Sequence, residues 1–402
     1  MYKIEKYIEN YESNERKRIL KQLSPIHKEI LKFIKSNKLL IFDTFAFEYW
    51  LKDFVPNPPI EQYYYSVYSP TPRNNIIELA DKLFDSGFKM IEAKKDYTGG
   101  QESYVITYLA YKVIKIYYCP EKLIKIMPNK NNFVDINILK IHNLMAFTQP
   151  MACVSRWLEL YKYDTLIDEH YPLSIKTIKD TNTTKTPHKI LDKIKKILDK
   201  FDNILFIGNY AYLEYLKMAD YGNYFPKTTS YEILTDNPNE ILDKLKKEFK
   251  DIEVKEKRSP LHFHKSKYAI KINKIKVLDI YDNNGICSPT NDKLGTYHLV
   301  LLYLYIGWWN SFKMDNSQIR DKLGKMITNL ICARLHYLEK TNKTGIAQYQ
   351  MVKQSPFDIF QVKCIGKQID YEKEYKIRKW EGKEPDRLMG IRSYKPEIEK
   401  KN

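Results

Sequence analysis

The sequence lacks paired cysteines, long apolar runs and an apolar leader, and each absence excludes a class of protein. Its five cysteines, at 119, 153, 287, 332 and 364, form no Cys-x-x-Cys motif and follow no metal-ligand spacing. This pattern predicts a reducing compartment and excludes a structural zinc site. The N-terminus has no signal-peptide core, and the longest apolar run, 299–309, is too short to span a bilayer. We therefore expect a soluble, intracellular protein with no membrane partner.

Arginine is also scarce, since only ten of the 67 basic residues are arginine, although the formal net charge is +17. A charge of this size favours a polyanionic partner because bound lysines release counterions from phosphates. AT-rich coding enriches Lys, Asn, Ile and Tyr together and would give the same excess without selection for binding. Both interpretations stay open at this point.

The chain is long enough for two lobes, with 402 residues of which 43% are hydrophobic. The segment 12–37 has helical periodicity, and Ser24-Pro25 predicts that the helix restarts there. A Thr- and Lys-rich stretch marks the linker. We predict N-terminal helices over 1–38, a first α/β domain with a helical extension over 39–173, a linker over 174–188, a second α/β unit over 189–290, and a helical C-terminal region with a basic tail over 291–402.

The second half of the chain repeats the pattern of the first. Thr44 and Asn209, each in a turn between a short apolar strand and a helix, lie 165 residues apart. The segment from Ile76 to Phe84 matches Ile241 to Phe249 at the same offset, and the strands 112–117 and 276–281 match at 164. The near-constant offset predicts two tandem α/β units with mixed sheets, and hence an α+β or α/β fold class. Chance similarity in an Ile-, Lys- and Tyr-rich chain is the alternative.

The first unit contains the stretch 63–72, YYYSVYSPTP, which is rich in tyrosine and contains no acid. A strand-turn-helix at 39–51 precedes this stretch, and further strands follow it. Such a layout is typical of nucleotidyl transfer, in which about three carboxylates on adjacent strands hold two divalent ions. A small-residue turn opening a helix would supply backbone N–H groups to the triphosphate.

The order of several short motifs resembles the poly(A) polymerase catalytic subunits of giant viruses and poxviruses, which have a nucleotidyltransferase fold. The resemblance extends over about residues 39 to 396, and no one motif is specific. The motifs are 68–72, 142–144, 156–159, 170–173, 206–212, 284–289, 295–297, 364–366, 378–379 and 382–383.

The first unit departs from the family where the resemblance places the metal-binding acids. The Asp-x-Asp positions fall on Tyr64 and Ser66, and the third acid falls on Lys115. The phosphate turn is Asp43-Thr44 instead of two small residues. A phenol and a hydroxyl are poor Mg²⁺ ligands, and an ammonium repels the ion, so Lys115 could itself occupy the place of the metal. A shifted alignment that brings in Glu61 requires an insertion.

The second unit keeps more of the pattern. Gly208-Asn209 is a plausible phosphate turn, Glu232 aligns with Ser66, and Asp279 aligns with Lys115, although Ser230 takes the first acid position. In the resembling polymerases the first unit carries catalysis. We therefore predict a structural or RNA-binding role for the second unit, with Glu232 and Asp279 as the fallback catalytic pair.

The resemblance implies a role in mRNA 3′-end polyadenylation in the host cytoplasm, at the virus factory, with the virion as the alternative location. Three hypotheses follow. In the first, the protein is a degenerate subunit that needs no cofactor and that binds RNA, or pairs as a homodimer or with an active paralogue. In the second it is an active adenylyltransferase that uses ATP with Mg²⁺ or Mn²⁺, and in the third it is a virion scaffold that keeps only the fold. Candidate RNA contacts in the basic tail are Arg378, Lys379 and Lys383.

Overall fold

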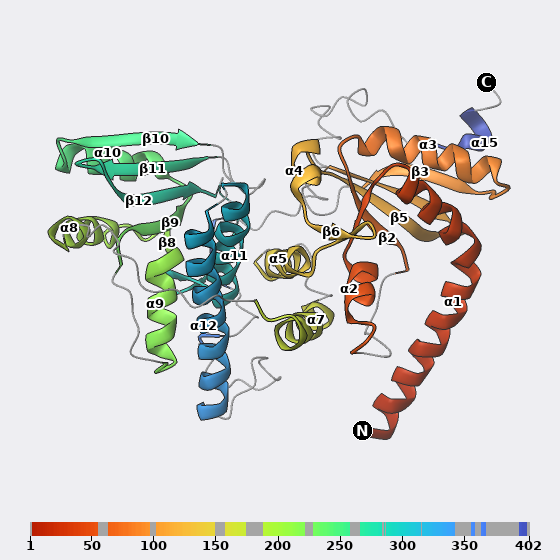
Figure 1. Ribbon diagram of the computed structural model, residues 1–402, viewed down its shortest axis with the longest axis horizontal. Helices are drawn as coiled ribbons and strands as arrows, with labels where there is room; N and C mark the ends of the chain where they lie inside the picture. The colour runs from red at the N-terminus through yellow and green to blue at the C-terminus, as the bar shows by residue number, and fades with distance from the viewer. Residues whose placement is uncertain are drawn as a thin grey trace. The chain divides into compact units, whose positions relative to one another are not determined.

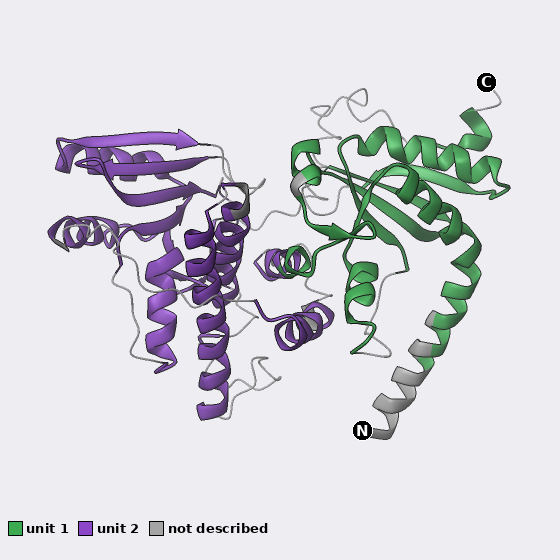
Figure 2. Ribbon diagram, in the orientation of Figure 1, with its two compact units in different colours: residues 1–140, 370–402 green, residues 141–369 purple. Residues whose placement is uncertain are grey.

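The computed structural model forms two compact units, residues 1–140 with 370–402 and residues 141–369 (Figure 2). We describe each by itself. The structure describes residues 2–54, 63–96, 102–148, 157–173, 188–221, 228–257, 266–283, 285, 287–314, 316–341, 355–357, 363–366 and 394–399. The predicted linker thus lies outside the described residues, apart from its last residue, which begins a helix.

The first unit opens with one long helix, α1 (Tyr2–Ser36), which is drawn red in Figure 1. The predicted restart at Ser24-Pro25 is wrong, because Pro25 lies inside the continuous helix. Proline removes one backbone hydrogen bond from a helix interior. Leu23 and Ile26, on either side of it, are completely buried. Burial of the apolar face outweighs the local cost.

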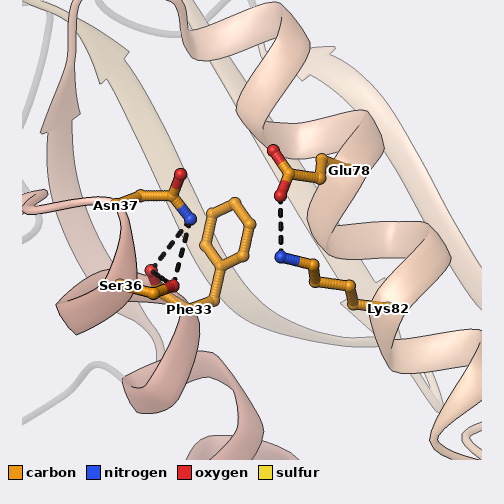
Figure 3. Close-up of polar contacts among 5 residues, drawn as sticks. All are labelled: Phe33, Ser36, Asn37, Glu78 and Lys82. Atoms are coloured by element: carbon orange, nitrogen blue, oxygen red, sulfur yellow. Dashed lines mark hydrogen bonds and ion pairs between the residues drawn. The ribbon is translucent and has the colours of Figure 1, made fainter.

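The end of α1 is closed by backbone and side-chain hydrogen bonds without a glycine, and the side-chain bonds are drawn in Figure 3. Ser36 Oγ and Asn37 Nδ2 donate hydrogen bonds of 3.0 and 3.1 Å to the Phe33 carbonyl oxygen, which also accepts one of 3.0 Å from the Asn37 backbone N–H. Across from them, Lys82 Nζ lies 5.1 Å from the centre of the Phe33 ring and 2.7 Å from a Glu78 carboxylate oxygen. These contacts join the end of α1 to a helix of the same unit.

The first unit contains a seven-stranded mixed sheet in the order β3-β4-β5-β2-β1-β7-β6. Strand β2 pairs antiparallel with β1 and parallel with β5. The elements are β1 (Leu40–Phe42), α2 (Thr44–Leu51), β2 (Tyr65–Ser69), α3 (Pro72–Asp85), β3 (Ile91–Asp96), β4 (Ser103–Tyr108), β5 (Tyr111–Tyr118), α4 (Glu121–Ile126), β6 (Asn129–Lys130) and β7 (Phe133–Val134).

The second unit repeats this arrangement, with the sheet order β10-β11-β12-β9-β8-β14-β13-β15. Helix α5 (Ile136–Phe147) spans the boundary between the units. The other elements are α7 (Trp157–His170), α8 (His188–Leu198), β8 (Ile204–Ile207), α9 (Gly208–Met218), β9 (Tyr231–Thr235), α10 (Pro238–Glu248), β10 (Ile252–Lys257), β11 (Lys267–Ile272), β12 (Ile275–Asp282), β13 (Ser288–Asn291), β14 (Leu294–Gly295), α11 (Tyr297–Lys313), α12 (Ser317–Thr341) and β15 (Cys364–Ile365).

The two sheets agree strand by strand, so the predicted repeat and the α+β fold class are confirmed. The order β3-β4-β5-β2-β1-β7-β6 becomes β10-β11-β12-β9-β8-β14-β13. Both crossover helices begin with a proline, Pro72 and Pro238, whose missing N–H costs nothing in a first turn. The repeat also includes the hairpins β6-β7 and β13-β14, which sequence analysis did not predict because each strand has only two to four residues.

The last described residues of the chain complete the edge of the first sheet. Tyr394 forms an antiparallel bridge with Ala93 of β3, and its hydroxyl donates to Asp81 Oδ1 at 2.7 Å. Helix α15 (Pro396–Glu399) follows, and Glu397 accepts a hydrogen bond of 2.9 Å from the Met90 N–H. This segment covers backbone groups of an edge strand that would otherwise be open to pairing.

No helix in the part of the chain that the structure describes has the length and apolar character needed to cross a membrane. One disulfide joins Cys287 to Cys364. Sequence analysis did not predict this bond, because 77 residues separate the two cysteines and no local motif links them.

His27 gives the first unit an expected sensitivity to acid. Burial lowers the pKa of His27 to about 4, against a smaller opposing effect of a backbone hydrogen bond at Tyr63. Its ring lies 5.9 Å from Phe45 and 5.3 Å from Tyr65, in edge-to-face contact. Below pH 6.5 the unfolded chain binds a proton that the folded chain does not, so this group reduces stability as the pH falls toward 4.

We expect the titration of His27 to lower the free energy of unfolding by on the order of 3 kcal/mol between pH 7 and pH 4. In His27→Gln, which cannot titrate, the free energy of unfolding should fall by that much less over the same range. Urea unfolding at a series of pH values measures the difference. Parallel pH profiles for the two proteins would contradict the assignment.

Candidate functional site

The predicted phosphate turn of the first unit lies between β1 and α2. The Asp43 carbonyl oxygen accepts hydrogen bonds from the N–H groups of Ala46 and Phe47, at 2.9 and 3.0 Å, and so opens α2. Asp43 adopts φ 66° and ψ −149°, a conformation that is almost restricted to glycine. Thr44, the first helical residue, is buried. An acid therefore occupies a backbone position suited to glycine, and its charge faces the site.

Replacing Asp43 with glycine is expected to stabilise the protein by about 1 kcal/mol, because relief of the backbone strain exceeds the entropy cost of glycine. Asp43→Ala is the matched control. It removes the same carboxylate, including its 3.4 Å contact with Ser66 Oγ, but keeps the Cβ that makes the conformation unfavourable. Thermal unfolding of both variants separates backbone from side-chain effects. Equal destabilisation by the two changes would show that the turn is not strained.

The two central acid positions of the first unit are adjacent on neighbouring strands. Ser66 of β2 pairs with Lys115 of β5 in the parallel register, and Phe42 of β1 pairs with Ser66 on the other side. Ser66 and Lys115 are buried, with 1% and 5% of their surface exposed. Tyr64 lies just before β2, with its ring 5.9 Å from Lys112 Nζ. The structure thus brings together two of the residues that sequence analysis aligned with the metal ligands, Ser66 and Lys115.

Lys115 is held by an acid that sequence analysis missed. Its Nζ lies 3.0 Å from Asp96 Oδ2, and the exposed fractions of the two side chains are only 6% and 8%. Asp96 ends β3, two strands from Lys115, and Lys112 Nζ approaches the same oxygen at 3.8 Å. No short spacing in the sequence signals a contact across an intervening strand. The ammonium therefore belongs to a buried ion pair within the sheet.

Aromatic rings fill the same face of the sheet. Phe42 stacks on Tyr68 with ring centres 4.1 Å apart, and Tyr117 contacts both rings. Lys115 Nζ lies 4.5 Å from the centre of the Tyr117 ring. Burial raises the pKa of Tyr68 well above its usual range. These side chains occupy the face on which the predicted metal ligands would have to stand.

In the second unit the equivalent turn has kept its glycine. Gly208 adopts φ +60° and opens α9, with Asn209 in the first turn of the helix. Glu232 of β9 lies directly against it: a Cβ built on Gly208 would stand 2.5 Å from Glu232 Oε1. The carboxylate of Glu232 is therefore beside the N-terminus of α9, where backbone N–H groups favour an anion.

Asp279 of β12 pairs with Glu232 in the parallel register and is 99% buried. Two lysines hold its carboxylate, since Lys267 Nζ and Lys276 Nζ lie 2.6 and 2.8 Å from Oδ2. Lys267 also donates a hydrogen bond of 2.7 Å to the Tyr281 hydroxyl. Burial raises the pKa of Glu232, and the charge of Asp279 raises it further, against the opposing effect of the lysines.

The two units thus carry buried ion pairs in which the matching residues, Lys115 and Asp279, have opposite charge. In the first unit a lysine of the last long strand, β5, is paired with an aspartate. In the second an aspartate of the matching strand, β12, is paired with lysines. Lys112 and Lys276 occupy equivalent positions and approach the anion in both. In the second unit the lysines neutralise the carboxylate at the metal-ligand position, and in the first unit that position carries an ammonium.

A catalytic divalent ion does not fit these side chains. Among the described residues, no group of three or more His, Cys, Asp or Glu side chains is placed to hold a metal. Mg²⁺ prefers octahedral oxygen ligands supplied by carboxylates and water. Glu232 and Asp279 are the two acids in register, and Asp279 is already neutralised by lysine.

Four further residues named from the sequence lie outside the described part of the chain. They are the RNA-contact candidates Arg378, Lys379 and Lys383, and the alternative acid Glu61.

Comparisons with known proteins agree with this architecture. The family model described as "Poly(A) polymerase catalytic subunit" matches residues 28–153. The model described as "APMV, Putative poly(A) polymerase, catalytic subunit, C-terminal" matches residues 176–402, more than half of the chain. A "Putative poly(A) polymerase catalytic subunit" of Acanthamoeba polyphaga mimivirus is 22% identical over 408 residues, which cover 87% of this chain and 68% of the relative.

A solved structure has the same fold. The crystal structure of the Megavirus polyadenylate synthase aligns with a TM-score of 0.76 and 21% identity, over 95% of this chain and 81% of that chain. The likeness extends through both units. The two family models together confirm the resemblance drawn from the order of the motifs: the chain belongs to the family of viral poly(A) polymerase catalytic subunits.

Proposed function

We propose that this chain acts in mRNA 3′-end polyadenylation as a subunit that does not itself catalyse nucleotidyl transfer. Its contribution is to bind RNA, or to pair with a second copy or with an active paralogue. The buried ion pair between Lys115 and Asp96 is the observation that carries the proposal. It places a neutralised ammonium where the two-metal mechanism needs a carboxylate.

The other residues of the first site support the same conclusion. Asp43 at the turn would repel a triphosphate, and Ser66 supplies a hydroxyl in place of a charged ligand. The aromatic rings of Phe42, Tyr68 and Tyr117 fill the face beside them. Restoring an acid at position 66 alone would therefore leave the turn, the Lys115–Asp96 ion pair and the aromatic packing unsuited to catalysis.

The second unit is no substitute catalytic centre under this proposal. Its best anion position, the N-terminus of α9, has the Glu232 carboxylate against Gly208. Its other acid, Asp279, is paired with two lysines at 2.6 and 2.8 Å. A nucleotide would have to displace Glu232, and a metal would have to displace both ammonium groups.

RNA as the partner is supported by the net charge of +17 and by the family to which the chain belongs. Neutralising phosphates with lysine makes affinity fall steeply as salt rises. We place this role in the host cytoplasm, at the virus factory, as the setting in which a viral poly(A) polymerase subunit would meet mRNA.

The test is to incubate the purified chain with labelled oligo(A), ATP and Mg²⁺ or Mn²⁺, and to measure extension and RNA retention in the same samples. We expect retention that weakens as salt rises, and no extension. Extension that survives repurification would overturn the proposal, and its loss in Asp279→Ala would identify the second unit as the active one. Absence of both extension and retention at low salt would favour a scaffold role over RNA binding.

A further inference from the structure

The disulfide between Cys287 and Cys364 lies at one edge of the second sheet. Cys287 comes directly before β13 and is 5% exposed, and Cys364 begins β15 and is partly exposed. The bond joins an internal strand hairpin to a C-terminal segment 77 residues later. Nothing in the proposed function requires this bond.

Apart from the disulfide, few backbone contacts between described residues hold β15 in place. The strand has two residues, and its register pairs Ser288 with Ile365 and Pro289 with Cys364. Pro289 has no N–H to donate to the ladder. The neighbouring Thr290 N–H donates to the Lys363 carbonyl oxygen at 2.9 Å. So short a pairing adds little stability without a further restraint.

The chain just before β15 is anchored independently. Phe357 is completely buried, and its ring lies 5.4, 5.4 and 5.1 Å from the rings of Tyr215, Tyr297 and Tyr337. These partners come from α9, α11 and α12 of the same unit. Opening the disulfide would therefore leave the Phe357 anchor intact and act on residues 363–366, which pair with β13.

We propose that the Cys287–Cys364 bond is a redox-controlled clasp that fixes residues 363–366 to β13 when oxidised and frees them when reduced. A small thiol such as glutathione, as thiolate, attacks the more exposed Cys364 sulfur, forms a mixed disulfide there and displaces Cys287 as its thiolate. A second thiolate then releases the Cys364 thiolate and forms the oxidised dimer of the reductant. Two electrons pass to the protein, and two protons complete its two thiols.

The compartment sets the state of the clasp. Cytosolic glutathione keeps most thiols reduced, whereas a particle outside the cell lies in an oxidising environment. The released form is thus expected where polyadenylation takes place, and the fixed form after export. This reconciles a cysteine pattern typical of a reducing compartment with a cysteine pair positioned for a disulfide.

The experiment uses the full chain, oxidised with glutathione disulfide or reduced with dithiothreitol. Alkylation in denaturant should modify two cysteines fewer in the oxidised form. Amide hydrogen exchange of residues 287–291 and 363–366 should be at least tenfold faster after reduction, while β9 and β12 stay unchanged. Neither readout involves RNA or catalysis, so failure here is distinguishable from failure of the proposed function.

Two double variants provide the matched comparison. Cys287→Ser with Cys364→Ser should exchange like the reduced protein under both conditions, whereas Cys119→Ser with Cys332→Ser should keep the full redox response. Unchanged exchange in β9 and β12 shows that each variant is folded. Alkylation of all five cysteines after oxidation, or equal exchange at β13 and β15 in both states, would overturn the clasp.

Discussion

Lys115→Asp is expected to destabilise the first unit by about 3–5 kcal/mol, because it leaves two acids facing each other in a buried site. Asp96→Lys should cost a similar amount, since it leaves two ammonium groups there. In the double variant, with the charges exchanged, the loss of unfolding free energy should be smaller than the sum of the two single losses by more than about 1 kcal/mol. The second unit already has an acid at the position that matches Lys115, because Asp279 of β12 pairs with Lys267.

The double-mutant cycle is measured by urea unfolding of the four proteins. Lys112→Asp is a control on the same oxygen, because Lys112 is 46% exposed and lies 3.8 Å from Asp96. A half-exposed pair of this kind is expected to contribute no more than about 1 kcal/mol. If the two single losses simply add in the double variant, the pair makes no specific contribution, and replacement of a metal by an internal ion pair is the wrong description.

Gly208→Ala is expected to destabilise the second unit by about 2–4 kcal/mol. The new Cβ would stand 2.5 Å from Glu232 Oε1, and a φ of +60° costs any residue with a Cβ about 1–2 kcal/mol by itself. Gly285→Ala separates the two effects. Gly285 has φ +72° but no atom within 4 Å of the added Cβ, so it should show only the backbone cost.

Truncating the clashing carboxylate gives a second comparison. In a Glu232→Ala background, Gly208→Ala should cost less than in the wild type, because only the Cβ of residue 232 remains close, at 3.0 Å. Thermal unfolding in both backgrounds measures the difference. Equal costs at 208 in the two backgrounds would show that Glu232 does not lie against the turn.

The repeated fold was predictable because it depends on local patterns. Apolar strands, proline at the start of the crossover helices and a near-constant offset are all visible in the sequence, and the sheet order confirms them. The continuity of α1 through Pro25 was not, because it depends on burial against the rest of the unit. The short hairpins had too few residues to show a period.

The candidate site was predictable in part for the same reason. Ser66 with Lys115, and Glu232 with Asp279, were aligned from the sequence and lie side by side in register. Their charge partners, Asp96 and Lys267, come from other strands, so no spacing along the chain pointed to them. The sequence showed which acids were absent, and only the fold showed what neutralises the residues that replaced them.

Binding of Mn²⁺ tests the central claim most directly, and it can be followed by the loss of the free-ion electron paramagnetic resonance signal on titration with the protein. If internal ion pairs have replaced the metal sites, the protein is expected to show no saturable binding of micromolar Mn²⁺. When ATP is present, the signal should fall only by the amount that binding of Mn²⁺ to ATP itself explains. Stoichiometric binding that is lost in Asp279→Ala or Asp96→Ala would contradict the account, because it would show that these acids hold a metal ion.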